Sequence, residues 1–191
     1  MMDPIFQDSS LPWAIDMDGT LIREDVTELA ANKCLHNPFL WHTLVYALFL
    51  KYFWSKFHAQ RYLEIRFPPN PKLLTYNKDL IQRIESHRER GGHVIIATAA
   101  HHRVGTSVAK HVGLFDDVIG SDPPTIMDAA AAVKAKLLSE RFPQGFMYAG
   151  NSKDDIYVWE SDGCKAAMFV NCKPEVLGMA QKIGKPYIVI P

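Results

Sequence analysis

The sequence predicts an α/β protein, built on an open parallel sheet with a small all-helical segment inserted after the first strand. Two observations indicate the sheet. Short apolar runs alternate with segments of helical periodicity over most of the chain, and polar residues follow several of these runs directly. A third observation indicates the insertion, because residues 24–75 break the alternation and carry helical patterns alone.

Five short apolar runs are typical of buried parallel strands. The first four read WAIDM, HVIIAT, DVIG and GFMYAG, and the fifth reads KAAMFVN. They cover residues 13–17, 93–98, 117–120, 145–150 and 165–171. In an open, Rossmann-like sheet of this kind, ligands bind beyond the carboxyl ends of the strands. The polar residues that end these runs are therefore the first candidates for a functional site.

Helical patterns fill the intervals between the runs. The segment from Tyr76 to Arg90 carries apolar residues at helical spacing and is followed by two glycines, which commonly end helices. Residues 104–112 and 128–141 also predict helices. Strand and helix thus alternate from residue 76 onward, as expected of one α/β domain.

We call residues 24–75 the helical cap, because we expect this insertion to lie over the strand ends. Residues 25–36 predict a helix with Asp25 at its N-cap. A dense apolar segment follows, and the prolines at 68–71 end it. The predicted division is an α/β core of residues 1–23 and 76–191 and a helical cap of residues 24–75.

The segment from Phe39 to Trp54 allows three interpretations. Its apolar density favours a buried cap helix. The aromatic side chains could instead form a surface for a lipid tail or a membrane, with Lys51, Lys56, Arg61 and Arg66 beside anionic headgroups. A transmembrane helix is the third interpretation, but the segment contains a lysine and is shorter than a helix that spans a bilayer.

Composition and charge exclude one class of partner and indicate a compartment. The 191 residues include 21 basic and 21 acidic side chains, so no global charge attracts the protein to nucleic acid. The three cysteines form no CxxC pair, and their odd number predicts no disulfide framework. Residues 1–10 have no basic segment followed by an apolar one, so we expect no signal peptide. A cytoplasmic location fits, with the helical cap as a site of membrane association.

Asp16 and Asp18 stand one residue apart where the first apolar run ends, and Gly19 and Thr20 follow at once. Burying an unpaired carboxylate is costly, so a strand that ends on two of them predicts a functional site. One carboxylate can attack phosphorus and form an aspartyl-phosphate, while the second protonates the leaving alcohol and later deprotonates water. Mg²⁺ would keep the attacking carboxylate ionised. A simple turn is the structural alternative, but the full sequence DMDGTL after a strand favours catalysis.

The segment DMDGTL resembles the first motif of the haloacid dehalogenase superfamily, whose members are mostly Mg²⁺-dependent phosphatases and phosphotransferases. The resemblance implies a Ser or Thr at the end of the next core strand, and Thr98 matches it. It also implies a lysine before or early in a later helix, which stabilises charge on the nucleophile and the phosphate. Lys134 and Lys136 both qualify, and the spacing to Leu138 and Phe142 favours Lys134.

The fourth motif of the superfamily is an acidic GDxxxD sequence, and this chain has GNSKDD at residues 150–155. Asn151 stands where the first aspartate, a direct metal ligand, is expected, and Asp155 matches the second. An amide oxygen can still bind Mg²⁺, with one negative charge less and a weaker expected affinity. The resemblance implies that Asp16, the main-chain carbonyl of Asp18 and Asn151 hold Mg²⁺, with Asp155 acting through water or by orienting the ligands.

The same resemblance implies roles for four catalytic residues. Asp16 is the nucleophile, Asp18 is the general acid and base, and Thr98 and Lys134 bind the phosphoryl group. Dehalogenase activity is disfavoured, because Asp18 supplies an acid/base group that phosphate esters need and alkyl halides do not.

Four residues beside the motifs are expected to contact the substrate: Gly19, Thr20, Ala99 and His101. Two alternatives to an enzyme stay open. One is a binding or regulatory module on the same fold, with Asn151 marking lost catalysis. The other is a peripheral membrane protein whose main role is to bind lipid.

Three longer stretches resemble, more narrowly, the phosphatase-like domain often joined to membrane prenyltransferases of the UbiA type. They are residues 73–100, 108–122 and 140–162. The GNS form of the fourth motif is familiar in that group. The resemblance implies a small-molecule or lipid-linked phosphate as substrate, such as polyprenyl-phosphoribose 5-phosphate, and a functional link to a prenyltransferase. Fold and motifs do not determine the leaving group.

Overall fold

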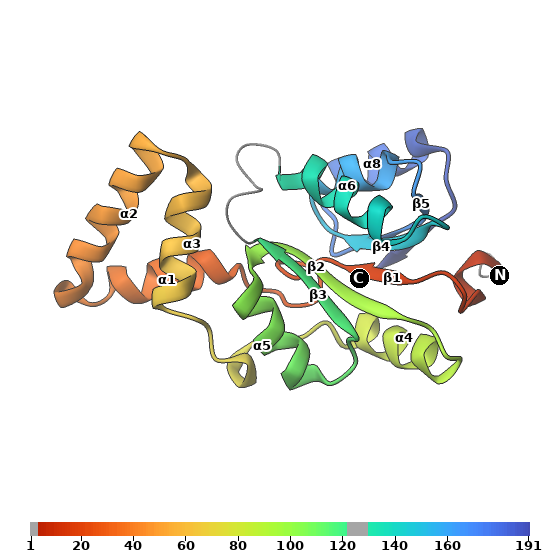
Figure 1. Ribbon diagram of the computed structural model, residues 1–191, viewed down its shortest axis with the longest axis horizontal. Coiled ribbons are helices and arrows are strands. Elements are labelled where there is room, and N and C mark those ends of the chain that lie inside the picture. Colours follow the sequence, from red (N-terminus) through yellow and green to blue (C-terminus); the bar gives the residue numbers. More distant parts are fainter. Residues whose placement is uncertain (1–3, 122–129) are drawn as a thin grey trace.

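A six-stranded parallel sheet forms the centre of the molecule (Figure 1). The computed structural model describes residues 4–121 and 130–191. Within them the strand order is β3-β2-β1-β4-β5-β6, and every neighbouring pair is parallel. The strands are β1 (Trp13–Ile15), β2 (Val94–His101), β3 (Asp117–Ser121), β4 (Phe146–Gly150), β5 (Cys164–Val170) and β6 (Tyr187–Ile190). The predicted α/β class with a parallel sheet is confirmed.

Five of these strands coincide with the predicted apolar runs, and β6 has no counterpart among them. β6 is four residues long and pairs with β5 at the edge of the sheet, so it lacks the length and the burial that mark a central strand. β1 is shorter than the predicted 13–17. The chain turns after Ile15, where the N–H groups of Thr20 and Ile22 both donate to the carbonyl of Met17.

Two groups of helices cover the two faces of the sheet (Figure 1). One face carries α4 (Lys78–Glu89) and α5 (His102–Val112). The other carries α6 (Ala130–Arg141), α7 (Ile156–Glu160) and α8 (Pro174–Ile183). Successive residues of a strand point to opposite faces, so Ile15 joins the first core cluster and Ala14 the second. The first two residues of the predicted helix 128–141 lie outside the described part of the chain.

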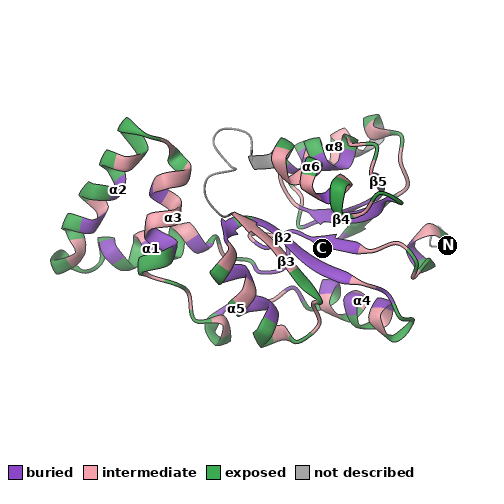
Figure 2. Ribbon diagram, viewed as in Figure 1, coloured by how far each residue is buried: buried purple, intermediate pink, exposed green. Residues whose placement is uncertain are grey.

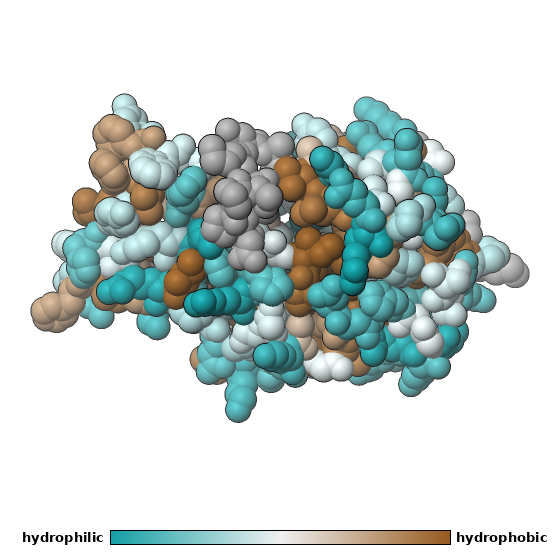
Figure 3. Space-filling view, in the orientation of Figure 1, coloured by the Kyte–Doolittle hydropathy of each residue, from teal (hydrophilic) through white to brown (hydrophobic). Residues whose placement is uncertain are grey.

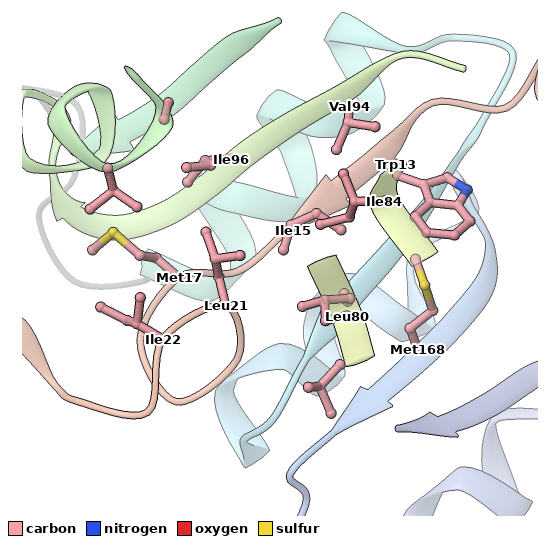
Figure 4. Packing of buried hydrophobic residues seen from close by; sticks show 14 of the residues in the cluster. Trp13, Ile15, Met17, Leu21, Ile22, Leu80, Ile84, Val94, Ile96 and Met168 are labelled. Atoms are coloured by element: carbon pink, nitrogen blue, oxygen red, sulfur yellow. The ribbon is translucent and has the colours of Figure 1, made fainter. Parts of the chain in front are cut away.

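The core beneath α4 also anchors the loop that follows β1 (Figure 4). Leu80 and Ile84 of α4 are fully buried in it, and Met17 and Leu21 extend it past the end of β1. Burial of each such side chain contributes about 1.5–3 kcal/mol. The loop that carries the two aspartates is therefore held in place by apolar packing on either side of them.

The helical cap lies at one end of the molecule, at the left of Figure 1. Its helices are α1 (Val26–Leu35), α2 (Trp41–Phe53) and α3 (Lys56–Arg66). Asp25 caps α1 as predicted, because its side chain accepts a hydrogen bond from the N–H of Glu28 at 2.9 Å. The chain leaves and re-enters the core at one place, where the N–H of Arg23 donates to the carbonyl of Thr75 at 2.9 Å. The division into core and cap at these residues stays a prediction.

α2 is mostly exposed, so the favoured interpretation of this segment, a buried helix, is wrong (Figure 2). Of its thirteen residues, Thr43 and Ala47 are buried. The cap cluster consists mainly of small side chains: Ala30, Cys34, Ala47, Ala59 and Leu63. The three short helices thus pack through narrow faces and leave the aromatic side chains outside. Within residues 4–121 and 130–191, no helix combines the length and the apolar content needed to cross a bilayer.

His87 is a buried titratable group on the inner face of α4. Its ring stacks on Trp13, with 4.3 Å between the ring centroids. Gly92 lies so close to the ring that a Cβ there would be 2.2 Å from Nε2. Burial and then the charge of Arg90 lower the pKa of His87 to about 4. The ring is therefore neutral in the folded protein under conditions in which an unfolded chain binds a proton.

This pKa predicts a loss of stability in mild acid. The unfolded chain binds the proton below about pH 6.5, whereas the folded protein binds it only near pH 4. The free energy of unfolding therefore decreases as the pH is lowered. For this group the decrease is about 2 kcal/mol from about pH 7.5 to about pH 5. His87→Phe keeps the stacking and removes the proton site, so urea denaturation at the two pH values will show a smaller difference. Equal pH dependence in both proteins would contradict the assignment.

Candidate active site

Most of the predicted site residues line one pocket between the sheet and the helical cap. The pocket has a volume of about 340 Å³ and lies at the carboxyl ends of β1, β2 and β4, where open α/β sheets bind ligands. The core contributes Asp16, Asp18, Gly19, Ala99, Ala100, Lys134, Asn151, Ser152, Asp154 and Asp155. The segment that leads into the cap, together with the cap itself, contributes Arg23, Asp25, Thr27, Gln60 and Glu64.

Asp16 directly follows β1 and is buried. Its N–H donates to the carbonyl of Ala149 in β4 at 2.9 Å, which fixes the backbone at the strand end. Its Oδ1 accepts a hydrogen bond from Lys134 Nζ at 2.8 Å, and its Oδ2 accepts one from the hydroxyl of Thr20 at 3.2 Å. Burial raises the pKa of Asp16 to about 6, although the Lys134 ammonium opposes the shift. The carboxyl group is therefore mostly ionised at neutral pH.

Asp18 is half-buried and has a different environment. Its Oδ1 accepts a hydrogen bond from the N–H of Val26, the first residue of α1, at 2.9 Å. Burial, followed by the charge of Asp16, raises the pKa of Asp18 well above its usual range. Burial and the neighbouring carboxylate thus both favour the protonated form of Asp18. A general acid must hold a proton that it can donate, so the shift is in the direction that this role needs.

Gly19 brings the loops after β1 and β4 into direct contact. Its φ of 73° lies in the left-handed region, and a Cβ at this position would be 2.0 Å from Nδ2 of Asn151. Both the conformation and the contact exclude a side chain. The amide of Asn151 consequently lies beside the loop that carries Asp16 and Asp18.

Lys134, the residue that the spacing favours, lies in the site, and Lys136 does not. Nζ of Lys134 is 2.8 Å from Asp16 Oδ1 and 3.7 Å from Asp155 Oδ1, and the side chain is 11% exposed. The side chain of Lys136 is 76% exposed and pairs with Glu140 on the same helix. Burial alone would lower the pKa of Lys134, but the carboxylates of Asp16 and Asp155 outweigh it and the net shift is upward. Lys134 is therefore a fixed positive charge.

The side chain of Asp155 holds the loop after β4 in place through hydrogen bonds. Its Oδ2 accepts hydrogen bonds from the N–H groups of Asn151 and Ser152, both at 3.0 Å, and from the hydroxyl of Ser152 at 3.1 Å. Its Oδ1 accepts one from the hydroxyl of Tyr148 at 2.7 Å. These four bonds are in line with the expectation that Asp155 orients other residues.

Tyr148 is a site residue that the sequence motifs do not contain. Its hydroxyl oxygen accepts a hydrogen bond from Lys134 Nζ at 2.8 Å, and the hydroxyl donates a hydrogen bond to Asp155 Oδ1. Burial raises the pKa of Tyr148 well above its usual range, so the phenol stays neutral. The available signal was the alternation along β4, because Tyr148 and Gly150 lie on the same face of a strand that ends at the site.

The three predicted residues at the end of β2 have different surroundings. Ala99 is exposed and lines the pocket. Thr98 is buried, its Oγ1 accepts a hydrogen bond from the N–H of Ala100 at 3.0 Å, and it lines a smaller neighbouring cavity. His101 is buried, and its Nδ1 accepts a hydrogen bond from the N–H of Arg103 at 3.1 Å. Ala99 therefore reaches the pocket, whereas Thr98 and His101 lie outside its described lining. Their roles in binding stay predictions.

Glu64 of α3 is a second site residue that the sequence does not reveal. Its Oε2 accepts a hydrogen bond from the N–H of His101 at 2.6 Å, and its Oε1 accepts one from the hydroxyl of Thr27 at 2.7 Å. Burial raises the pKa of Glu64 despite both bonds. Each partner is 37 positions away in the sequence, so no local motif marks the residue. Glu64 connects the helical cap to the end of β2.

The oxygen atoms beside Asp16 suit a magnesium ion. The predicted donors are the carboxylate of Asp16, the main-chain carbonyl of Asp18 and the amide of Asn151, and Mg²⁺ prefers such hard oxygen ligands. Gly19 brings the two loops that carry them together. Among the described residues, no group of three or more His, Cys, Asp or Glu side chains is arranged to hold a metal. The three oxygen donors named above are chemically suited to Mg²⁺, and an ion held by them would complete its octahedron with water or phosphate oxygens.

Comparison with known proteins places this chain in a family. The family model of haloacid dehalogenase-like hydrolases matches residues 14–158, and the chain belongs to this family. The uncharacterized protein y4nM of Sinorhizobium fredii (strain NBRC 101917 / NGR234) is 30% identical over 156 residues. That match covers 81% of this chain and 29% of the relative, so the chain spans less than a third of the length of this curated relative.

Solved structures share the fold at low identity. A predicted phosphatase from Clostridium acetobutylicum superposes with a TM-score of 0.65 at 15% identity, over 95% of this chain and 94% of that one. A phospho-aspartyl intermediate analogue of phosphoserine phosphatase superposes with a TM-score of 0.58 at 12% identity, over 93% and 92%. These likenesses confirm the predicted fold of a parallel α/β core with a helical cap. The narrower resemblance to a prenyltransferase-associated domain stays a prediction.

Gly19→Ala tests whether the contact between the two loops is required. Gly91 offers a matched control, because its φ of 83° is similar and a Cβ there would meet nothing within 4 Å. Gly91→Ala should cost about 1 kcal/mol of stability through its left-handed backbone and keep hydrolase activity. Gly19→Ala adds a collision with Asn151 and should lower kcat/KM about a hundredfold. Equal activity of the two variants would contradict the prediction.

Lys134→Gln tests the buried positive charge, with Lys136→Gln as the exposed control. Loss of the Lys134 ammonium leaves Asp16 near Asp155 without a counter-charge, so the free energy of unfolding should fall by about 3–5 kcal/mol. The exposed variant should change it by less than about 0.5 kcal/mol. Urea denaturation at neutral pH measures both. A Lys134→Gln protein as stable as the control would show that the ion pair does not stabilise the folded protein.

Proposed function

We propose that this protein is a Mg²⁺-dependent phosphomonoesterase that works through an aspartyl-phosphate on Asp16. The observation that carries the proposal is the pair of carboxyl groups in one pocket, with Asp16 bound to the Lys134 ammonium and the pKa of Asp18 raised well above its usual range by burial. Membership of the hydrolase family supports hydrolysis. The phosphatases among the structural neighbours support phosphate esters as substrates.

In the first step, a carboxylate oxygen of Asp16 attacks phosphorus, and the bond between phosphorus and the ester oxygen breaks. The leaving oxygen takes the proton that Asp18 holds, so the alcohol departs neutral. Lys134 stays within hydrogen-bond distance of Asp16 and offsets negative charge at the reacting centre. The product is an acyl phosphate on Asp16.

In the second step, water attacks the phosphorus of this acyl phosphate. Asp18 is now a carboxylate and takes a proton from the attacking water. The bond between phosphorus and the Asp16 oxygen breaks, which releases phosphate and restores both carboxyl groups. The hydrogen bonds from Thr20 and Lys134 hold Asp16 in one orientation through both steps.

Mg²⁺ is the proposed cofactor, held by Asp16, the main-chain carbonyl of Asp18 and Asn151. When bound, the ion neutralises charge on the phosphoryl oxygens. The chain contributes by presenting the oxygen donors, and Asp155 fixes the main chain of Asn151 for this purpose. Because Asn151 is neutral, we expect a weaker affinity for Mg²⁺ than an aspartate would provide.

The pocket lining supports a polar leaving group. Arg23, Gln60 and Glu64 form its wall on the side of the helical cap and offer donors and acceptors to hydroxyl groups. The described lining contains Ala99 and Ala100 as its apolar side chains. We therefore propose a sugar phosphate or a similar polar monoester, either free or carried on a prenyl lipid whose tail stays outside the pocket. The second form would link the protein to a prenyltransferase.

A binding or regulatory module on the same fold is the alternative function, because Asn151 removes one acidic metal ligand. This alternative predicts no phosphate release with or without Mg²⁺. Phosphate release from aryl, sugar and lipid-linked phosphates therefore separates the two functions and also ranks the leaving groups.

Asp16→Asn should abolish phosphate release, with kcat lowered by about a thousandfold or more, because an amide does not attack phosphorus. Asp79→Asn, at an exposed position in the first turn of α4, is the matched control and should be fully active. Acid quenching of the wild type with labelled substrate should trap phosphate on the protein, and Asp16→Asn should trap none. Wild type and Asp16→Asn equally inert across the whole panel would overturn the proposed function.

A further inference from the structure

The end of the helical cap carries a large exposed apolar surface. We call it the α2 apolar surface. It follows α2 from the turn before the helix to the residue after it, and its most exposed members are Phe39, Val45, Leu48, Tyr52, Phe53 and Trp54. Phe39 is 87% exposed and Tyr52 is 84% exposed. Figure 2 shows α2 mostly green, and Figure 3 shows brown and tan side chains at this end of the molecule. Continuous exposed apolar patches are uncommon on soluble proteins and mark contact surfaces.

This surface is separate from the active-site pocket. No residue of α2 is among the described residues that line the pocket. α3 contributes Gln60 and Glu64 to the pocket and also packs against α2. α2 is therefore on the outer side of the helical cap (Figure 1), and its side chains are not the wall of a substrate site.

The charges on the two helices nearest the α2 apolar surface are mostly positive. α2 and α3 carry four basic side chains (Lys51, Lys56, Arg61 and Arg66) and one acidic side chain, Glu64, whereas the other three acidic residues of the helical cap lie at its start, at positions 24, 25 and 28. Glu64 is buried, and its two carboxylate oxygens each accept a hydrogen bond. Lys51 and Lys56 lie on α2 and α3 and are exposed. The whole chain has balanced charge, so the positive charge is concentrated on the part of the molecule that also carries the apolar surface.

Aromatic side chains beside basic ones fit the boundary between lipid headgroups and acyl chains. α2 has thirteen residues, too few to span a bilayer but enough to lie in its plane. A second copy of the chain fits less well, because the basic side chains around two such surfaces would repel each other. The combination of apolar area and positive rim therefore matches an anionic membrane.

We propose that the α2 apolar surface docks the helical cap onto an anionic membrane, with the aromatic side chains among the lipids and Lys51 and Lys56 at the headgroups. The proposal concerns a surface outside the pocket and holds whether or not the protein hydrolyses phosphate esters. Docking leaves the core and its pocket on the aqueous side of the contact.

Vesicle co-sedimentation tests the proposal. The wild type should bind vesicles of phosphatidylcholine and phosphatidylglycerol in equal parts, and bind pure phosphatidylcholine more weakly. Tyr52→Ser combined with Phe53→Ser should lower the partition coefficient by roughly tenfold or more. Lys51→Gln combined with Lys56→Gln should lower it by roughly tenfold on the anionic vesicles, and high salt should have the same effect. Tyr157→Ser, on α7 at a position that is 60% exposed, is the matched control and should bind as the wild type does.

Circular dichroism checks that the variants fold, and hydrolysis of a soluble ester should be unchanged in the Tyr52/Phe53 variant, because neither residue is part of the pocket. Three results would overturn the proposal. One is a wild type that fails to bind anionic vesicles. Another is a Tyr52/Phe53 variant that binds as tightly as Tyr157→Ser. The third is sedimentation velocity showing a dimer in solution that the Tyr52/Phe53 substitutions dissociate, since the surface would then serve self-association.

Discussion

The contact between the ammonium of Lys134 and the carboxylate of Asp16 is the interaction on which the site depends. It joins residues 118 positions apart at 2.8 Å, and so connects the end of β1 to α6. Without it, Asp16, Asp18 and Asp155 would be three carboxyl groups in one poorly hydrated region, where burial and mutual repulsion favour protonation. With it, the pKa of Asp16 stays at about 6, low enough for a nucleophile at neutral pH. Tyr148 extends the same network, because it stays neutral and connects Lys134 to Asp155.

How much of the fold and site the sequence predicts depends on how far apart in the sequence the interacting residues lie. The strand ends and the aspartate pair were predictable, because the carboxyl ends of parallel strands meet at one edge of the sheet. The preference for Lys134 came from the family motif and from its spacing to Leu138 and Phe142. Glu64 was not predictable, since its partners are 37 positions away on both sides. The prediction of a buried α2 was wrong for a related reason. Apolar density measures the tendency of a helix to be buried, but whether a partner surface exists depends on how α1 and α3 pack, and they present a narrow face of small side chains.

The helical cap has two chemically distinct sides. Its inner side is polar, and Glu64 fixes it to the core by accepting the N–H of His101. Removing that carboxylate would leave a buried N–H without its acceptor, at a cost of about 1–3 kcal/mol. Its outer side is apolar and basic. α3 separates the two sides, so a polar substrate and an apolar contact do not compete for the same residues. A lipid-linked substrate would place its phosphate on the inner side, whereas the membrane itself would meet the outer side.

Asn151 changes the charge of the site in a way that the rest of the structure accommodates. An aspartate there would add a further carboxylate near Asp16, Asp18 and Asp155. The basic side chains in the described lining of the pocket are Lys134 and Arg23, and Lys134 pairs with Asp16 at 2.8 Å. The added repulsion would raise the pKa of Asp16 further in the absence of metal, and the nucleophile would then depend on bound Mg²⁺ for its ionisation. With an amide, the charge of Lys134 suffices to keep Asp16 mostly ionised. For the proposed Mg²⁺ site, the amide would thus weaken metal affinity but would also reduce how far the protonation state of the proposed nucleophile depends on the metal.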